Sequence, residues 1–324
     1  MKKHIAALLC LVLIAGILPG CGSSGAAQPG TQKKRIVTTI FPEYDWVRQV
    51  LGEEAERFEL TLLLDKGVDM HSYQPTADNM VTISTCDLFV YVGGESDEWV
   101  DDALAGKTNP KMAVVRLMDV LGDAAKEEEI VEGMQEDAES AEEEAAEYDE
   151  HVWLSLKNAK LFCKAIAERL GEIDPEGRAA YSANAEAYAA KLDALDEAYR
   201  SMILQSARKT VLFGDRFPFR YLVDDYGLEY YAAFAGCSAE TEASFETVIF
   251  LADKVDALGL PAVLTIENSD GKLAQTIIAS TETKSARVLR LDSLQSKTRQ
   301  DINAGATYLG AMEQNLEILR QALQ

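Results

Sequence analysis

Histidine is scarce in this sequence: the 324 residues include three, and one of them, His4, lies among the first twenty. The motifs HExxH and GxSxG are absent, and with them the signatures of the common zinc proteases and serine hydrolases. Basic residues are also few, because 31 Lys and Arg residues accompany 54 Asp and Glu residues and give a formal net charge of −23. This charge argues against nucleic acid and anionic lipid head groups as partners and favours cations.

The cysteines form no metal or redox motif. The five are widely spaced, whereas zinc and redox sites built from cysteine use close pairs. Three lie beyond the N-terminal region, and an odd number cannot all form disulfides: Cys86, Cys163 and Cys237. We interpret these three as buried apolar thiols. One disulfide between two of them is the alternative in an exported protein.

The N-terminus carries an export signal rather than a membrane span. Lys2 and Lys3 precede an apolar run at 5–18, which has the length of a signal-peptide core. The run ends at LPGC, which resembles the lipobox of bacterial lipoproteins, and the flexible stretch GSSGAAQPGTQ follows. We predict a lipoprotein signal peptide at 1–20, lipid attachment through Cys21 and a tether at 21–34. The alternative is an ordinary secretory signal with an incidental cysteine.

Beyond the tether, short strand-like and helix-like segments alternate. The apolar stretches IVTTI, ERFELTLLL, CDLFVYVG and MAVVRLM have the character of strands, with helical patterns between them. This alternation predicts a parallel sheet covered by helices on both faces. It returns after TVLFG in the C-terminal part of the chain. We therefore expect an α/β fold with two lobes of parallel sheet, at 35–156 and 208–324.

A helical connection at 157–207 is expected to join the lobes. Its second helix carries one apolar seam, in which the residues recur at steps of three, four and seven: Tyr181, Tyr188, Leu192, Leu195, Tyr199 and Met202. This spacing predicts one continuous helix of some thirty residues, about 45 Å long. A helix of that length is expected to act as a rigid link between the lobes.

An acidic loop is predicted at 123–150, within the first lobe. The window from Glu127 to Glu150 contains thirteen acidic residues and almost no apolar periodicity. Because its charges repel one another and it has little apolar surface to bury, we expect a mobile loop. Either the loop gathers metal ions or it is a solvated tether.

Both remaining histidines stand in the same local pattern, D-x-H-x-aromatic. His71 follows Asp69 in VDMHSYQP, and His151 follows Asp149 in YDEHVWLSL. A neighbouring carboxylate can fix the tautomer of the imidazole ring while the second ring nitrogen binds a divalent cation. One such loop histidine is more often a solvated surface residue. The repetition of the pattern favours a shared metal site.

The two motifs resemble those of the bacterial zinc and manganese ABC-transporter substrate-binding proteins. DMHSYQPTADNM is similar to the family's D-P-H-x-Y-E-P-T, and DEHVWLSLKNAK is similar to D-P-H-x-W-L-x-P. The long helix and the stretch CDLFVYVGGESDEWVD also fit the family pattern. The resemblance therefore covers essentially the whole mature chain. It implies an exported, lipid-anchored, monomeric receptor and no enzymatic activity. The receptor would bind its ion between two lobes and deliver it to an ABC permease with its ATPase.

The remaining ligands implied by the resemblance depart from the family pattern. Where the family has a histidine or glutamate as third ligand, this chain has FGDRFPFRYL. Arg216 cannot bind a cation, so Asp215 is the candidate, and an ion pair between these two residues is the alternative. Asp292 in RLDSL is the candidate fourth ligand. Glu267 in TIENSDG is a reserve carboxylate or a partner of the ligands, as Asp69 and Asp149 are for their histidines.

Two imidazoles with one or two carboxylates suit Zn(II) or Mn(II), and Zn(II) is the first expectation because it forms the stronger complexes. Binding requires neutral imidazoles, so the affinity is expected to fall below about pH 6. Two other functions use the same features. One is a secreted zinc-dependent hydrolase, and the other is a surface adhesion lipoprotein.

Overall fold

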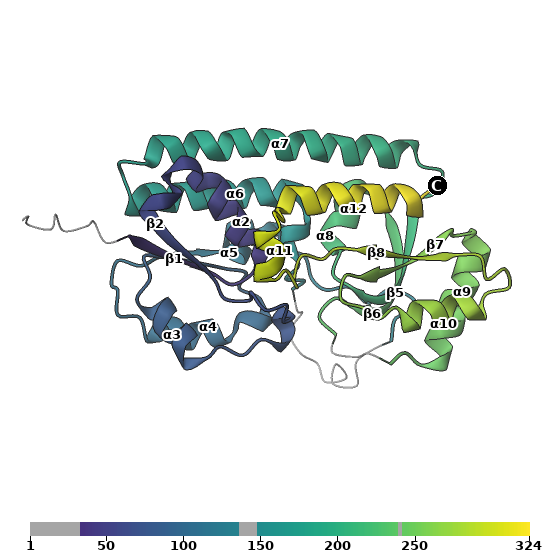
Figure 1. Ribbon diagram of the computed structural model, residues 1–324. Helices are drawn as coiled ribbons and strands as arrows, with labels where there is room; N and C mark the ends of the chain where they lie inside the picture. The colour runs from purple at the N-terminus through teal and green to yellow at the C-terminus, as the bar shows by residue number, and fades with distance from the viewer. Residues whose placement is uncertain (1–32, 136–147, 239–241) are drawn as a thin grey trace, which may run out of the picture. The chain divides into compact units, whose positions relative to one another are not determined.

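The computed structural model describes residues 33–135, 148–238 and 242–324 (Figure 1). The predicted signal peptide, Cys21 and nearly all of the predicted tether lie outside these residues. The first lobe contains a four-stranded parallel sheet in the order β2-β1-β3-β4. Its strands are β1 (Lys34–Thr38), β2 (Phe58–Leu62), β3 (Leu88–Tyr91) and β4 (Ala113–Arg116). Its helices are α2 (Phe41–Leu51), α3 (Ala77–Ser84), α4 (Trp99–Ala105) and α5 (Leu117–Leu121).

The second lobe repeats this design with a four-stranded parallel sheet in the order β6-β5-β7-β8. The two-lobe α/β fold predicted from the sequence is confirmed. The strands are β5 (Thr210–Phe217), β6 (Glu229–Ala235), β7 (Ala262–Ile266) and β8 (Arg287–Leu291). The helices are α8 (Arg220–Tyr226), α9 (Phe245–Leu258), α10 (Lys272–Ser280), α11 (Arg299–Asn303) and α12 (Tyr308–Ala322).

Two helices connect the lobes: α6 (Leu156–Ile173) and α7 (Arg178–Gln205). The 28 residues of α7 form the continuous helix that the apolar seam predicts, and all six seam residues are buried. α7 lies across α2, α6 and α12 (Figure 1). At 1.5 Å per residue α7 is about 42 Å long.

One hydrophobic core runs through both lobes. It includes the buried faces of α2, α6, α7 and α12 together with residues of both sheets. A second, smaller cluster lies in the C-terminal lobe and involves β6, β7, α9 and α10. Because close-packed interiors resist deformation, the shared core holds the lobes as one rigid framework.

The described parts of the acidic segment differ from the expected mobile loop. Residues 127–135 pack on the second lobe: the backbone N–H of Gln135 donates to the Ala233 carbonyl at 2.9 Å, and Met134 is buried. Glu129 pairs with Arg220 and Glu132 with Lys254. The expectation was wrong for these residues because basic side chains of the second lobe neutralise their charges, which a window of sequence does not show. Residues 136–147 lie outside the described part of the chain.

Within the described ranges, no helix combines the length and the apolar character that crossing a membrane requires.

Candidate metal centre

His71 lies in a short 3-10 helix, η2 (Met70–Ser72), in the loop that follows β2. The Asp69 carboxylate caps this turn by accepting the backbone N–H of His71 at 3.1 Å. The ring Nδ1 of His71 lies 2.7 Å from Oγ of Ser96, in the turn η3 (Glu95–Asp97) that follows β3. That hydroxyl donates in turn to Oε1 of Glu150 at 2.7 Å. The ring is therefore oriented by a serine and a carboxylate.

His151 lies immediately before the turn η5 (Val152–Leu154) and is completely buried. Oδ1 of Asp149 accepts both the backbone N–H of His151, at 2.8 Å, and the ring Nδ1–H, at 2.9 Å. The Trp153 ring packs beside the imidazole, with ring centroids 5.2 Å apart. Asp149 thus orients His151 as the sequence pattern predicts.

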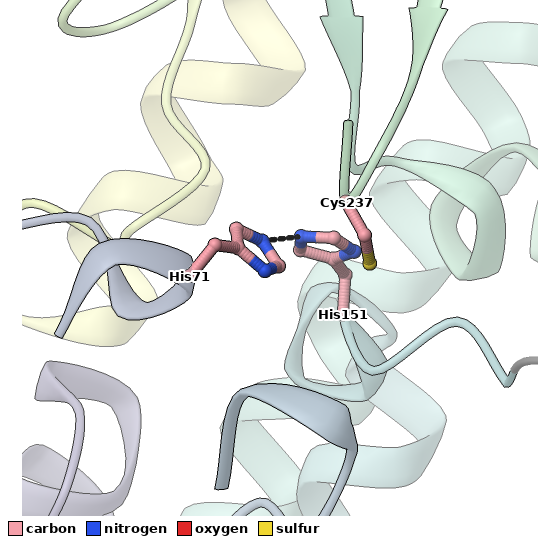
Figure 2. A group of neighbouring side chains, drawn as sticks. All are labelled: His71, His151 and Cys237. Carbon is pink, nitrogen blue, oxygen red and sulfur yellow. Dashed lines mark hydrogen bonds between the residues drawn. The ribbon is translucent and has the colours of Figure 1, made fainter. Parts of the chain in front are cut away.

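The Nε2 atoms of His71 and His151 face each other at 3.2 Å (Figure 2). Ser96 has one hydroxyl proton, and because it donates that proton to Glu150, it accepts Nδ1–H from His71. The Asp149 carboxylate likewise accepts Nδ1–H from His151. In both neutral rings Nε2 then carries a lone pair and no proton. Two lone pairs at this distance repel each other unless a proton on one of the rings, or a cation between them, is shared by both nitrogens.

This separation fits zinc. Two Zn–N bonds of about 2.0–2.1 Å at a tetrahedral angle place their nitrogens about 3.3 Å apart. The carboxylate-to-histidine contacts behind the rings are those that fix the tautomer and orientation of metal-binding histidines. The two rings therefore converge on a position where one small divalent ion would contact both Nε2 atoms.

The surroundings shift the pKa values of the two imidazoles in opposite directions. Burial, followed by the charge of His151, lowers the pKa of His71 to about 3. Burial opposes the charge on His151 as well, but the Asp149 carboxylate outweighs it and raises the pKa of His151. His71 is therefore neutral at physiological pH, and His151 is the ring for which a proton competes with a metal ion. The expected loss of affinity in acid stays a prediction.

A third ligand-bearing residue, Cys237, joins the two histidines. It follows β6 and lies beside His151 (Figure 2), and its Sγ is within 4.8 Å of one ring nitrogen of each histidine. Cys86 and Cys163 are buried free thiols as expected, but Cys237 has polar surroundings. Its backbone N–H donates to Glu128 at 3.0 Å, and Sγ lies 3.9 Å from Oε1 of Glu150. Burial and these carboxylates raise the pKa of the thiol well above its usual range.

Sequence reasoning gave no role in the centre to Cys237 or Ser96, and it considered Glu150 only as an acidic neighbour of His151. Ser96 lies in the stretch CDLFVYVGGESDEWVD, which resembles the family pattern, but nothing in that stretch indicates that the Ser96 hydroxyl reaches His71. The Glu150 side chain is 1% exposed, and Oε2 has no hydrogen-bond partner within the described residues. Gly94 leaves room for this carboxylate, because an added Cβ would lie 2.3 Å from Oε2. The only signal in the sequence was the position of Cys237 just after a strand.

The predicted carboxylate ligands lie elsewhere. Oδ1 of Asp215 accepts the N–H of Arg216 at 2.9 Å, and Oδ2 accepts that of Ile266 at 3.4 Å. Asp292 pairs with Lys297. The structure therefore does not group Asp215 or Asp292 with the histidines among the described residues.

Glu267 and Arg216 also have other partners. Glu267 accepts the backbone N–H and the hydroxyl of Ser293, at 2.8 and 2.9 Å. Arg216 pairs with Oδ2 of Asp69, so the surface pair with Asp215 considered from the sequence is not the contact that forms. Asp69 therefore lies between a guanidinium and the His71 ring, whose Nε2 is 4.0 Å from Oδ1.

Replacing Asp149 by asparagine should weaken zinc binding by about 10–100-fold, the usual cost of losing a carboxylate behind a metal-binding histidine. The amide keeps the shape of Asp149 but removes the charge that raises the basicity of His151. Isothermal titration calorimetry measures the effect. Asp123→Asn, at an exposed position, is the control and should bind as the parent chain does. An unchanged dissociation constant for Asp149→Asn would contradict the assignment.

The chain is similar to proteins with described zinc-binding roles. "Zinc-binding lipoprotein AdcA" of Streptococcus pneumoniae serotype 4 is 32% identical over 322 residues, which are 99% of this chain and 61% of AdcA. "High-affinity zinc uptake system protein ZnuA" of Bacillus subtilis is 29% identical over 321 residues, 97% of this chain and 95% of that protein. The chain thus spans about three fifths of AdcA and nearly all of ZnuA.

The structural comparison agrees with these relatives. The Zn(II)-bound ZnuA-like domain of Streptococcus pneumoniae AdcA superposes with a TM-score of 0.69 at 29% identity, over 90% of this chain and 99% of that domain. The family model described as "Zinc-uptake complex component A periplasmic" (ZnuA) matches residues 36–322. This match includes both lobes, the helical connection and all three residues of the centre, and it shows that the chain belongs to the ZnuA family.

Proposed function

We propose that this protein is the extracytoplasmic substrate-binding component of a divalent-metal ABC importer, with Zn(II) as its cargo. The observation that carries this proposal is the 3.2 Å approach of the two Nε2 atoms of His71 and His151, both held as lone-pair donors. Zinc-binding relatives of the same family support the choice of cargo. The role is one of binding and delivery. A hydrolase or an adhesion lipoprotein gains no separate support from the geometry of the centre.

The protein would deliver its ion without a wide hinge motion. The shared core and α7 hold the lobes together, whereas His71, His151 and Cys237 all lie in loops or short turns outside the α-helices and strands. Docking on a permease would therefore release the ion by moving these loops by small distances rather than by separating the lobes. The partners in this scheme are a permease and its ATPase.

We further propose that the protein acts as a monomer at the outer face of the cell membrane, held there through lipid on Cys21. The LPGC sequence and the lipoprotein name of the AdcA relative support this proposal. Metabolic labelling with a fatty acid should mark the parent chain and leave a Cys21→Ala chain unlabelled.

Metal analysis of the mature chain tests the cargo. Protein purified without added metal and then dialysed against equal zinc and manganese should retain about one zinc per chain and little manganese, because zinc forms the stronger complexes with nitrogen and sulfur ligands. Elemental analysis provides the measurement. Deleting the gene should also slow zinc accumulation by cells at limiting zinc. Retention of manganese in preference to zinc, or of neither ion, would contradict the proposal.

A further inference from the structure

A cysteine side chain lies beside the two histidines, whereas the family pattern has a nitrogen or oxygen ligand as the third ligand. The candidate third-ligand position on β5 holds Arg216, whose guanidinium is bound to Asp69 and has no lone pair with which to coordinate a cation. Cys237 follows the neighbouring strand β6, and its Sγ lies within 4.8 Å of one ring nitrogen of each histidine. Two imidazoles and one thiol therefore converge from three separate segments.

We propose that Cys237 binds the cargo ion as a thiolate, which gives a centre with two nitrogen ligands and one sulfur ligand. This inference rests on the proposed function, since it concerns the same ion. Tetrahedral zinc places a thiolate sulfur at about 2.3 Å and its nitrogen ligands at about 2.0–2.1 Å, so sulfur and nitrogen lie about 3.6 Å apart. Sγ lies within 4.8 Å of one ring nitrogen of each histidine, so binding requires the side chain or its loop to move toward the ion.

Glu150 supplies an independent observation. Its side chain is almost completely buried, and its Oε1 lies 3.6 Å from Nδ1 of His71, so a carboxylate stands beside the group of possible ligands. Oε1 lies 3.9 Å from Sγ of Cys237. When the ion binds, the S–H bond breaks, the S–metal bond forms and the proton passes to the Glu150 carboxylate. A divalent cation deprotonates a thiol that it coordinates, even where the thiol is otherwise protonated.

A thiolate ligand makes the centre selective for zinc over manganese. Thiolates bind zinc and other soft or borderline ions strongly and bind manganese weakly, because manganese prefers oxygen ligands. Cys237→Asp replaces the sulfur by a carboxylate on the same segment. This variant should lose zinc affinity while keeping manganese affinity, so that the ratio of the two affinities falls by at least about tenfold.

Cobalt(II) is the direct probe, because a cobalt–thiolate bond produces an intense charge-transfer absorption in the near ultraviolet that imidazole and carboxylate ligands do not produce. The parent chain titrated with cobalt should show this band at one equivalent. Cys237→Ser should lose the band and bind zinc about 100-fold more weakly, since it removes one of the strong ligands. Circular dichroism would confirm that the variant is folded.

Cys86→Ser and Cys163→Ser are matched controls, because both thiols are buried away from the centre, and both variants should keep the band. Cobalt binding by the parent chain without the band would overturn the thiolate ligand and leave the metal-binding function intact. A band that persists in Cys237→Ser would also overturn it. No binding of either ion by the parent chain would overturn this inference together with the proposed function.

Discussion

Alanine in place of His151 is expected to lower the affinity of the chain for zinc by about 100-fold or more, and alanine in place of His71 should have a similar effect. Zinc held by four protein ligands is bound with a free energy of about 10–16 kcal/mol, so one ligand contributes on the order of 3 kcal/mol to the binding free energy. Each tenfold change in affinity corresponds to about 1.4 kcal/mol. Each substitution removes one of the two Nε2 atoms that face each other at 3.2 Å.

The fold should survive both substitutions. Both histidines lie outside the hydrophobic core clusters and outside the α-helices and strands, so their removal leaves the framework of the lobes in place. Tyr73→Phe is a suitable control, because Tyr73 follows His71 in the same loop and its hydroxyl has no hydrogen-bond partner in the described residues. Calorimetric titration with zinc measures the affinity, and circular dichroism reports the fold. If both histidine variants bound zinc as tightly as the Tyr73→Phe control, the centre proposed here would be wrong.

Alanine in place of Trp153 should destabilise the chain by about 3–5 kcal/mol, the usual cost of truncating a large buried aromatic residue. Trp153 is fully buried, and its Nε1–H donates to the Ser293 carbonyl at 2.8 Å, beyond the end of β8. Its own carbonyl accepts the Tyr308 hydroxyl at 2.7 Å, at the start of α12. Trp153 thereby connects the His151 loop by hydrogen bonds to the segment after β8 and to α12.

Denaturation in urea, followed by circular dichroism, measures this loss of stability. Trp153→Phe separates the two contributions, because it keeps most of the buried ring but leaves the Ser293 carbonyl unsatisfied, at a cost of about 1–3 kcal/mol. The alanine variant should also bind zinc more weakly, because the Trp153 ring packs beside His151. A loss of less than about 1 kcal/mol for Trp153→Ala would show that this contact does not hold the loop.

Several features of the fold were accessible from the sequence because they depend on local pattern. The alternation of strand and helix segments predicted two parallel sheets, and the seam from Tyr181 to Met202 predicted α7. The acidic segment was misjudged for residues 127–135 because its partners, Arg220 and Lys254, lie far away in the chain. Charge density in a window predicts repulsion, but it cannot show which distant cations offset that repulsion.

The sequence by itself singled out the two histidines, and it determined the local contact of Asp149 with His151, because an aspartate stands two positions before each histidine and the cap geometry follows from the D-x-H spacing. Only the tertiary structure decided the rest of the centre. It directs Arg216 to Asp69 and Asp292 to Lys297, and it places Cys237 beside His151. Whether a carboxylate or a thiol reaches an ion depends on where the ends of strands in two separate sheets meet, and that meeting is set by the core which packs both lobes against α7.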